Sequence, residues 1–447
     1  MVGARGPVDV AIAGGVIADI GPALIAPGAT EIHGVSVLPG LHDHHVHLLA
    51  MAAARDSISC GSPAVTDRAS LIAALRDAPG EGWIRAVDYD EASAGPLDRQ
   101  VLDLMVEDRP VRIQHRSGAL WMLNSRAIEL LEVEVADDPG VERDASGQPT
   151  GRLWRMDSWL ATALGERDDP DLSVVGRELA AFGITGVTDA TPGPTATLAR
   201  AAARLPQRIV SMGEDPRGPL GRGPYKIVLA DHALPALEEL YATITRAHAD
   251  DRPVAVHSVT RESLFLFLAA LDAAGARSGD RVEHASVAPP EAISALARLG
   301  VAVVTQPSLV ARRGDDYLAR VEPRDLPDLW RYGSLLAAGV AVGLSSDAPY
   351  GDANPWHTID AAARRVTRSG AVLGAAESVS STTALDAFLG TPEDPGGTPR
   401  EITVGADADL VVLDCGVTTM LERPDESHVL STLIAGQPVY VRGDDAR

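Results

Sequence analysis

Apolar and polar positions alternate between two patterns along the middle of the chain. Short β-branched runs such as 253–258 and 301–306 stand beside segments with apolar residues at helical spacing, such as 262–274 and 290–299. This alternation is typical of parallel β/α units. The pattern therefore predicts an α/β fold.

The strand-like runs are numerous enough for a closed barrel. We expect eight strands, near residues 37–42, 184–189, 208–212, 225–229, 254–257, 282–284, 301–305 and 341–346. Residues 37–377, without a candidate insertion at 81–165, amount to 256 residues, close to the roughly 250 of a (β/α)8 TIM barrel. The sequence therefore predicts that the barrel starts at 37–80 and continues through 166–377.

The two ends of the chain share a sequence pattern that differs from the alternation in the middle. Residues 1–36 and 378–447 contain short β segments separated by turn signals such as Gly14-Gly15 and Gly436. Two β-rich ends around an α/β middle predict that the ends pair into one small β-sandwich domain.

Composition narrows the function classes. The 447 residues include 39 basic and 62 acidic side chains, for a net charge of −23, which argues against nucleic acid or an anionic membrane as partner. Two cysteines, Cys60 and Cys415, are too few for a disulfide framework. We expect a cytoplasmic enzyme that acts on a small molecule, and the sequence is compatible with a homo-oligomer.

The chain has one lysine. Of its 39 basic residues 38 are arginines, and the exception is Lys226 in a predicted strand. A preference for arginine codons accounts for the surface but not for this position. A partly buried lysine can lose its proton and react, whereas arginine stays charged, so Lys226 is a chemical candidate.

A histidine-rich segment follows the first predicted strand. His45 and His47 are two residues apart, so in extended chain both imidazoles point the same way and can reach one metal ion. The alternative is a loop that is merely rich in histidine. His44 must point elsewhere.

Further ligand-type residues stand at other predicted strand ends: His257, His284 and Asp347, with Lys226 nearby. The carboxyl ends of the strands of a β/α barrel meet on one face, where active sites lie. Together with His45 and His47 these residues make a six-ligand constellation. A lysine suits it if its neutral amine adds carbon dioxide, because the resulting carbamate is an anion that can bridge two metals.

The weaker candidates for contact with substrate also have ordinary structural explanations. His115 and Trp121 in the insertion are candidates for contact with substrate, against structural hydrogen bonding and packing. Arg312 is a candidate for binding an acidic substrate group, against a solvated surface role. Asp189 is expected behind the ligands, and Glu283 is expected to point toward the helix layer.

These motifs resemble the amidohydrolase superfamily over nearly the whole chain. The segment 39–47 opens the match, and the later Lys, His, His and Asp complete it. The finer match, to the branch that includes N-substituted formamide deformylases, rests on Ser117-Gly118 with Trp121 and Asn124-Ser125, on 183–189, on 282–285 and on 405–410. The chain departs from that branch at Ala119, where histidine is usual, and at 230–232, where Asp-Gly is usual.

The resemblance implies roles for the six residues. His45, His47 and Asp347 would hold one divalent metal, His257 and His284 the other, and carboxylated Lys226 would bridge the two together with a hydroxide. Zinc is expected, with manganese or iron as alternatives. Lys226 and Asp347 are the catalytic candidates, Asp347 because it can pass the proton of the water to the leaving nitrogen.

The resemblance and these residues together predict a metal-dependent hydrolase that cleaves an amide-like, non-peptide C–N bond. A mononuclear deaminase is disfavoured because the first glutamate after His257 is Glu262, and Lys226 would lack a purpose. An esterase, lactonase or phosphotriesterase with the same metals stays open. A non-catalytic homologue would be expected to have lost ligands, and all six are present.

Overall fold

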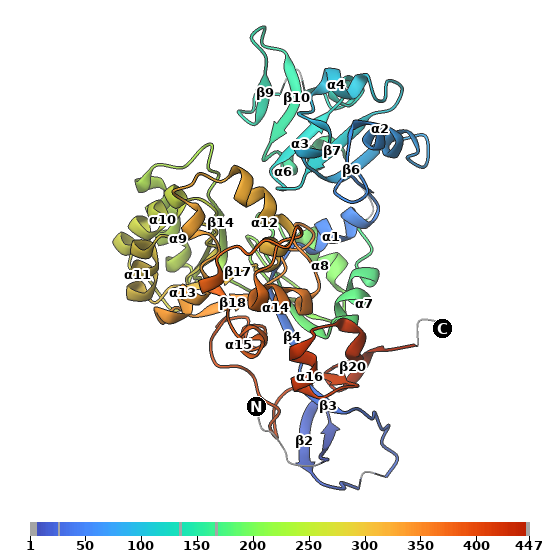
Figure 1. Ribbon diagram of the computed structural model, residues 1–447, viewed down its shortest axis with the longest axis vertical. Helices are drawn as coiled ribbons and strands as arrows, with labels where there is room; N and C mark the ends of the chain where they lie inside the picture. The colour runs from blue at the N-terminus through green and yellow to red at the C-terminus, as the bar shows by residue number, and fades with distance from the viewer. Residues whose placement is uncertain (1–6, 26, 134–135, 166–168, 444–447) are drawn as a thin grey trace. The chain divides into compact units, whose positions relative to one another are not determined.

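The structure is a computed structural model that describes residues 7–25, 27–133, 136–165 and 169–443. The chain divides into two compact units. The first joins Met1–Leu48 to Asp171–Arg447, and the second is Leu49–Pro170. Figure 1 gives the labels of the helices and strands.

Parallel strands form the centre of the first unit. One sheet has the order β13-β12-β11-β4 and the other the order β14-β15-β16-β17-β18, with parallel pairing throughout. The strands are β4 (Leu41–Val46), β11 (Ile184–Asp189), β12 (Arg208–Ser211), β13 (Leu220–Arg222), β14 (Tyr225–Val228), β15 (Val254–Ser258), β16 (Arg281–His284), β17 (Ala302–Thr305) and β18 (Val342–Leu344).

Hydrogen bonds also join the two sheets. Lys226 N at the start of β14 donates to Met212 O at 3.1 Å, and Asp347 N beyond β18 donates to His45 O in β4 at 2.9 Å. Every residue of β4, β11 and β16 is buried, as expected of parallel strands covered on both faces. The predicted α/β fold is confirmed.

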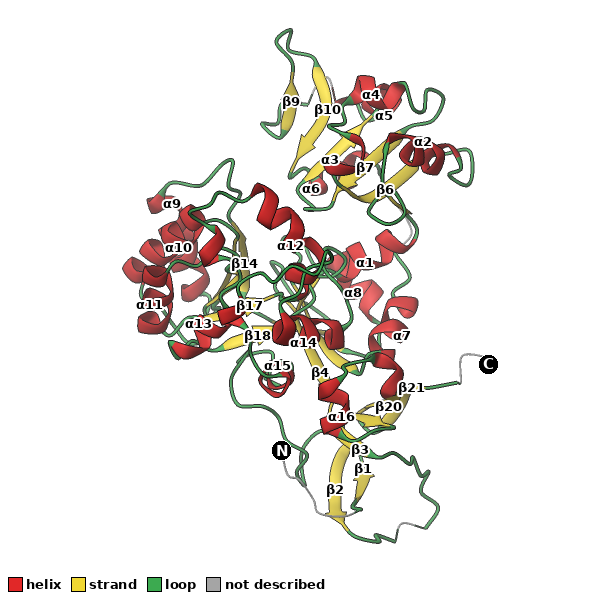
Figure 2. Ribbon diagram, viewed as in Figure 1, coloured by secondary structure: helices red, strands yellow, loops and turns green. Residues whose placement is uncertain are grey.

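Helices lie around these strands (Figure 2). The helices within residues 171–447 are α7 (Ser173–Ala181), α8 (Ala196–Ala202), α9 (Leu237–Ala249), α10 (Arg261–Ala274), α11 (Pro290–Leu299), α12 (Ser308–Arg320), α13 (Tyr332–Ala337), α14 (Pro355–Arg364), α15 (Ser381–Asp386) and α16 (Val417–Glu422), with the 3-10 turns η2 (Leu326–Asp328), η3 (Ala375–Glu377) and η4 (Glu426–His428).

Helix α10 shows why these segments are helical. Thr260 caps it by accepting a hydrogen bond from Ser263 N at 3.2 Å. Leu264, Phe267 and Leu271 then recur at helical spacing and are all buried. One apolar face thus packs inward while the opposite face meets solvent.

The first predicted strand is split into two. The sequence predicted one strand at 37–42, but the chain forms β3 (Ser36–Pro39) and β4, with a break at Gly40. Strand β3 pairs antiparallel with β19 (Leu410–Leu413), whereas β4 pairs parallel with β11. A Cβ atom on Gly40 would overlap the side chain of Thr185, so the close approach at the break requires glycine.

The two ends of the chain lie side by side. Strands β20 (Val429–Ile434) and β21 (Gln437–Val441) complete an antiparallel sheet of order β21-β20-β19-β3, and β1 (Asp9–Ala13) pairs with β2 (Val16–Gly21). Ile17 N donates to Ala406 O at 2.8 Å. Ile17 is also buried against Ala408, Leu410 and Leu433, so apolar contacts join the N-terminal hairpin to the C-terminal sheet.

The C-terminal β segment begins later than the predicted residue 378. Helix α15 and the residues after it lie against the parallel strands, since His42 N donates to Phe388 O at 2.9 Å and Leu344 N to Ala387 O at 3.2 Å. Backbone groups at these strands are thereby satisfied by a segment that the turn-rich sequence did not distinguish from the terminal sheet.

The second unit is larger than the predicted insertion at 81–165. Its sheet has the order β5-β6-β7-β8-β10-β9, and its first strand, β5, pairs with β6 although it is only two residues long. Leu71 and Leu75 join the apolar cluster of this unit, so residues 49–80 belong here and not to a barrel start at 37–80. So short a strand leaves no period-2 pattern in the sequence.

The elements of the second unit are β5 (Ile58–Ser59), β6 (Ile84–Tyr89), β7 (Val111–His115), β8 (Leu120–Leu123), β9 (Val141–Arg143) and β10 (Pro149–Trp154), with α2 (Arg68–Arg76), α3 (Glu91–Ala94), α4 (Arg99–Asp103), α5 (Ser125–Leu130) and α6 (Asp157–Ala163). Helix α1 (Leu48–Arg55) begins at the boundary.

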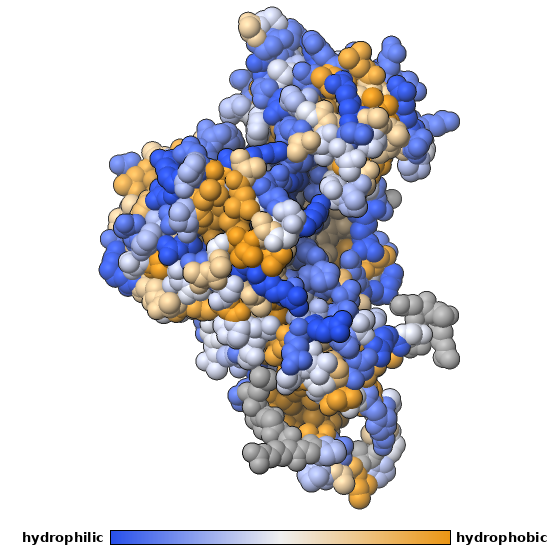
Figure 3. All heavy atoms as spheres, in the orientation of Figure 1, coloured by the Kyte–Doolittle hydropathy of each residue, from blue (hydrophilic) through white to orange (hydrophobic). Residues whose placement is uncertain are grey.

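Hydrophilic residues cover much of the face drawn in Figure 3, with smaller apolar areas between them. Among the described residues, no helix combines the length and the apolar composition needed to cross a bilayer.

Replacing Gly40 with alanine should lower the free energy of unfolding by about 1–3 kcal/mol, because the added methyl group overlaps Thr185 at the junction of β3 and β4. The measurement is the urea midpoint. Gly416→Ala is the control, since a Cβ there meets nothing within 4 Å. Equal midpoints for the two variants would contradict this reading of the junction.

Candidate active site

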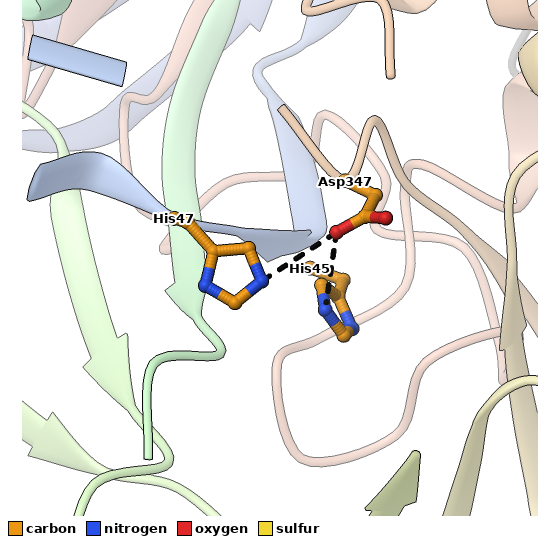
Figure 4. Close-up of side chains that lie close together, drawn as sticks. All are labelled: His45, His47 and Asp347. Carbon is orange, nitrogen blue, oxygen red and sulfur yellow. Dashed lines mark ion pairs between the residues drawn. The ribbon is translucent and has the colours of Figure 1, made fainter. Parts of the chain in front are cut away.

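Three of the six candidate residues meet where β4 and β18 end. His45 is in β4, His47 follows that strand, and Asp347 follows β18. Asp347 Oδ1 lies 3.5 Å from Nε2 of His45 and 3.5 Å from Nε2 of His47 (Figure 4). One donor atom from each of the three lies within 4.8 Å of the others, a spacing that one metal ion can span.

His257 and His284 continue the cluster. His257 is in β15 and His284 ends β16; their ring centroids are 4.6 Å apart, and the centroids of His284 and His45 are 4.9 Å apart. His284 has a φ of +73° and Asp347 a φ of +54°. Residues in this left-handed region carry backbone strain that is concentrated at functional sites.

Lys226 lies close enough to this cluster for the charge of Asp347 to act on its side chain. It is the second residue of β14 and is buried, and among the described residues its Nζ has no hydrogen-bond partner. Burial lowers the pKa of Lys226 from its ordinary 10.5 to about 8, although the charges of Glu283 and Asp347 act to raise it. The structure thus brings all six candidates into one neighbourhood of the first unit.

The carboxylate of Asp347 is held in its charged form. Burial alone would raise its pKa, but the hydrogen bond from His47 and the nearby His284 and His45 bring the pKa of Asp347 well below its usual range. His45 shows the opposite response, because burial and then the charge of Lys226 lower its pKa well below the usual value. A metal-binding histidine must be neutral, and the lowered pKa of His45 favours that state.

Glu283, which was expected to point toward the helix layer, contacts the site directly. His45 Nδ1 donates to Glu283 Oε2, and Arg281 Nε donates to Glu283 Oε1 at 2.6 Å, with all three side chains buried. Glu283 therefore points inward, not toward the helix layer. The expectation assumed regular alternation through His284, and the positive φ of His284 breaks it. Arg281 and Glu283 share strand parity, which was the available signal.

His284 has a different partner behind it. Its Nδ1 lies 2.8 Å from Gln306 Oε1, and Gln306 Nε2 donates to Ser345 Oγ at 2.9 Å. Because the amide nitrogen is used toward Ser345, Gln306 presents its carbonyl oxygen to the imidazole. His284 therefore donates from Nδ1 and directs Nε2 elsewhere.

Two buried aspartates hold the backbone at the site. Asp43 Oδ1 accepts from His45 N and from Ser346 N, each at 3.1 Å, and so ties β4 to the end of β18. Asp189 Oδ2 accepts from Leu48 N at 2.8 Å, directly after His47. Asp189 thus lies behind the candidate ligands.

Two substrate-contact candidates belong to the second unit. His115 bonds to Glu91 Oε2 at 3.0 Å and to Ser117 Oγ at 2.7 Å, and the bond to His115 lowers the pKa of Glu91 to about 2. Trp121 is buried, and its Nε1 donates to Asp157 Oδ1 at 2.9 Å. Each has partners within its own unit, and contact with substrate stays a prediction.

The third substrate-contact candidate, Arg312, lies on α12. It lines a cavity of about 830 Å³ together with Asp352, His357 and Arg364, and the described residues lining this cavity include none of the six. Its guanidinium also lies 3.5 Å from Gly351 O. A role for Arg312 in binding substrate likewise stays a prediction.

A second group of ligand-type residues lies in the terminal sheet region. Asp414, Cys415 and His428 have donor atoms within 4.8 Å of one another. Asp414 already accepts from His428 Nδ1 and from Arg442, each at 2.7 Å. A guanidinium thus supplies the positive charge beside this carboxylate, and the group is an ion-pair network.

Comparison with known proteins identifies the family of this chain. The model of the amidohydrolase family matches residues 32–440. The chain belongs to this family, which confirms the resemblance seen in the motifs.

Particular relatives cover nearly the whole chain. N-substituted formamide deformylase of Arthrobacter pascens is 27% identical over 97% of this chain and 95% of its own. The putative amidohydrolase YtcJ of Bacillus subtilis (strain 168) is 24% identical over 92% of this chain and 90% of its own. Among solved structures, an uncharacterized metal-dependent hydrolase from Pyrococcus horikoshii OT3 has a TM-score of 0.67 at 19% identity, covering 88% of both chains. That likeness concerns the fold.

The pKa of Lys226 predicts how stability depends on pH in metal-free protein kept free of carbon dioxide. Between pH 8 and 10.5 the unfolded chain retains the Lys226 proton whereas the folded chain releases it. Stability should therefore rise with pH over this window, by roughly 3 kcal/mol at most. Chemical unfolding of wild type and Lys226→Met at several pH values checks it. A difference between the two that does not vary with pH would contradict the depressed pKa.

Proposed function

We propose that this protein is a metal-dependent hydrolase that cleaves an amide-like, non-peptide C–N bond with two divalent metal ions, foremost zinc. The first ion would be held by His45, His47 and Asp347, the second by His257 and His284, and a carboxylated Lys226 would bridge them. We further propose that the two parallel sheets close into a (β/α)8 barrel, with the terminal sheets as a β-sandwich beside it.

One observation carries the proposal. Nε2 of His45 and Nζ of Lys226 are both buried and, within the described part of the chain, have no hydrogen-bond partner. A buried polar atom without a partner is costly. The surrounding donors are imidazoles and a carboxylate, the ligands that zinc takes in proteins. A bound cation would therefore satisfy Nε2 of His45, and carboxylation of Lys226 would replace its unpartnered amine with an oxygen ligand.

The metal ions, Asp347 and Lys226 would each have a separate role in the reaction. When bound, the metal ions would acidify a water molecule and polarise the substrate carbonyl. Asp347, held as a carboxylate by His47, can accept the proton of the water and return it to the leaving nitrogen. Burial of Lys226 favours the neutral amine that carboxylation requires.

The similarity to N-substituted formamide deformylase of Arthrobacter pascens supports a proposal for the substrate class. Its name assigns it N-substituted formamides, so we propose an N-acyl or N-formyl amine of small size. A deaminase is less well supported because Glu262, the nearest glutamate after His257, is exposed and lies 3.8 Å from Arg324. Hydrolysis of an ester or lactone is the remaining alternative, and the products distinguish it.

Protein purified without chelator should contain about two divalent metal ions per chain. Removing them should abolish release of amine from N-formyl and N-acyl amines, and added zinc should restore it, because the metals activate the water. Elemental analysis and product detection check this. Metal-free protein with no gain on adding zinc or manganese would contradict the proposal, and turnover of lactones or esters alone would favour the alternative.

Lys226→Ala should lose most metal and activity yet remain folded, and a short carboxylic acid should restore part of the activity by supplying the bridging oxygens. Lys226→Arg should fail as completely, because a guanidinium keeps its charge and cannot become an oxygen ligand. Metal content and turnover are measured in parallel. Near wild-type values for Lys226→Arg would show that Lys226 is a bystander.

A further inference from the structure

One histidine of each proposed metal position has a buried side chain behind its Nδ1, and these two side chains differ in charge. His45 Nδ1 donates to the carboxylate of Glu283, whereas His284 Nδ1 donates to the carbonyl oxygen of the Gln306 amide. Both supports are buried, Glu283 and Gln306 each being 0% exposed. The same imidazole atom is therefore backed by an anion in one case and by a neutral dipole in the other.

This difference affects the strength of the histidines as ligands. A carboxylate behind a metal-binding imidazole fixes its tautomer and raises the basicity of the opposite nitrogen. An amide oxygen fixes the tautomer but carries no net charge. Electrostatic interactions are stronger in a buried site than in water, so the distinction is larger here than it would be on the surface.

Arg281 holds the Glu283 carboxylate in place without neutralising its charge at the His45 imidazole. Its Nε donates to Oε1 of Glu283, while Oε2 faces His45. Arg281 also donates to His44 O at 3.0 Å, which fixes the guanidinium against β4. The negative oxygen thus lies between the arginine and the histidine, and the nearer charge dominates at His45.

From these contacts we propose that Glu283 and Gln306 are positioning residues that make the two metal positions differ in affinity and so set the order in which they fill. This inference rests on the proposed function. The position formed by His45, His47 and Asp347 binds its metal more tightly and fills first. The position at His257 and His284 binds more weakly and fills second, so scarce metal produces a singly loaded protein.

The test is a titration of metal-free protein with zinc in competition with a chromophoric chelator. Wild type should show two steps of different affinity. Glu283→Gln should weaken the tighter step by about 10- to 100-fold, the usual effect of losing such a partner. Gln306→Glu should instead strengthen the weaker step and bring the two steps closer together.

Glu377→Gln is the matched control. Glu377 is also a buried carboxylate, accepting from Ser334 N at 2.7 Å and lying 3.4 Å from Arg331 Nε, but it contacts none of the proposed ligands through these bonds. It should leave both steps unchanged. Far-ultraviolet circular dichroism and urea midpoints verify that each variant is folded.

The outcomes separate the two proposals. Wild type that binds no zinc or shows only one site contradicts the two-metal function itself. If wild type has two sites and Gln306→Glu changes the zinc affinity of neither, the proposed order of filling is wrong. If Glu283→Gln does not fold, the Gln306→Glu titration still decides, because it adds a charge without leaving Arg281 unpaired.

Discussion

The site depends on the backbone junction between the ends of β18 and β4. Asp347 N donates to His45 O and His47 N donates to Ala348 O, each at 2.9 Å, while Asp43 accepts from both segments. These bonds bring residues more than 300 positions apart in sequence to one place. Without this junction Asp347 would not lie beside Nε2 of His45 and Nε2 of His47. Asp347 adopts a left-handed conformation at this junction, with a φ of +54°.

Burial of charge is the second constraint. Asp347, Glu283, Arg281 and Lys226 are all buried in the same neighbourhood. Arg281 and Glu283 satisfy each other, but Lys226 Nζ lacks a hydrogen bond among the described residues. An isolated buried ammonium is costly. Conversion of this amine to an anion held between cations, as proposed, would replace an unfavourable burial with a favourable contact, which is a physical reason for keeping one lysine in an arginine-rich chain.

Much of the architecture was predictable because it follows from local patterns. The runs around Val256 and Val303 are strands followed by helices, as expected, and the spacing of His45 and His47 places both beside Asp347. Failures occurred where geometry departs from the regular pattern. The break at Gly40 depends on its approach to Thr185, a tertiary contact. Strand β5 is too short to leave a signal.

The missed role of Glu283 has the same origin. Strand alternation predicts that Glu283 and His284 face opposite ways, and the positive φ at His284 lets both reach the site. Gln306 was missed because a lone amide beyond a strand has no chemical signature until its partner is known. Sequence thus predicted the residues with ligand chemistry and Asp189 behind them, whereas the contacts of Glu283 and Gln306 depend on tertiary structure.

An X-ray structure of the zinc-loaded protein, with data at the zinc absorption edge, would test whether two metals share a carboxylated Lys226. We expect two anomalous peaks, one beside His45, His47 and Asp347 and the other beside His257 and His284, with electron density continuing beyond Nζ of Lys226. A single peak, or a lysine whose density ends at Nζ, would contradict it.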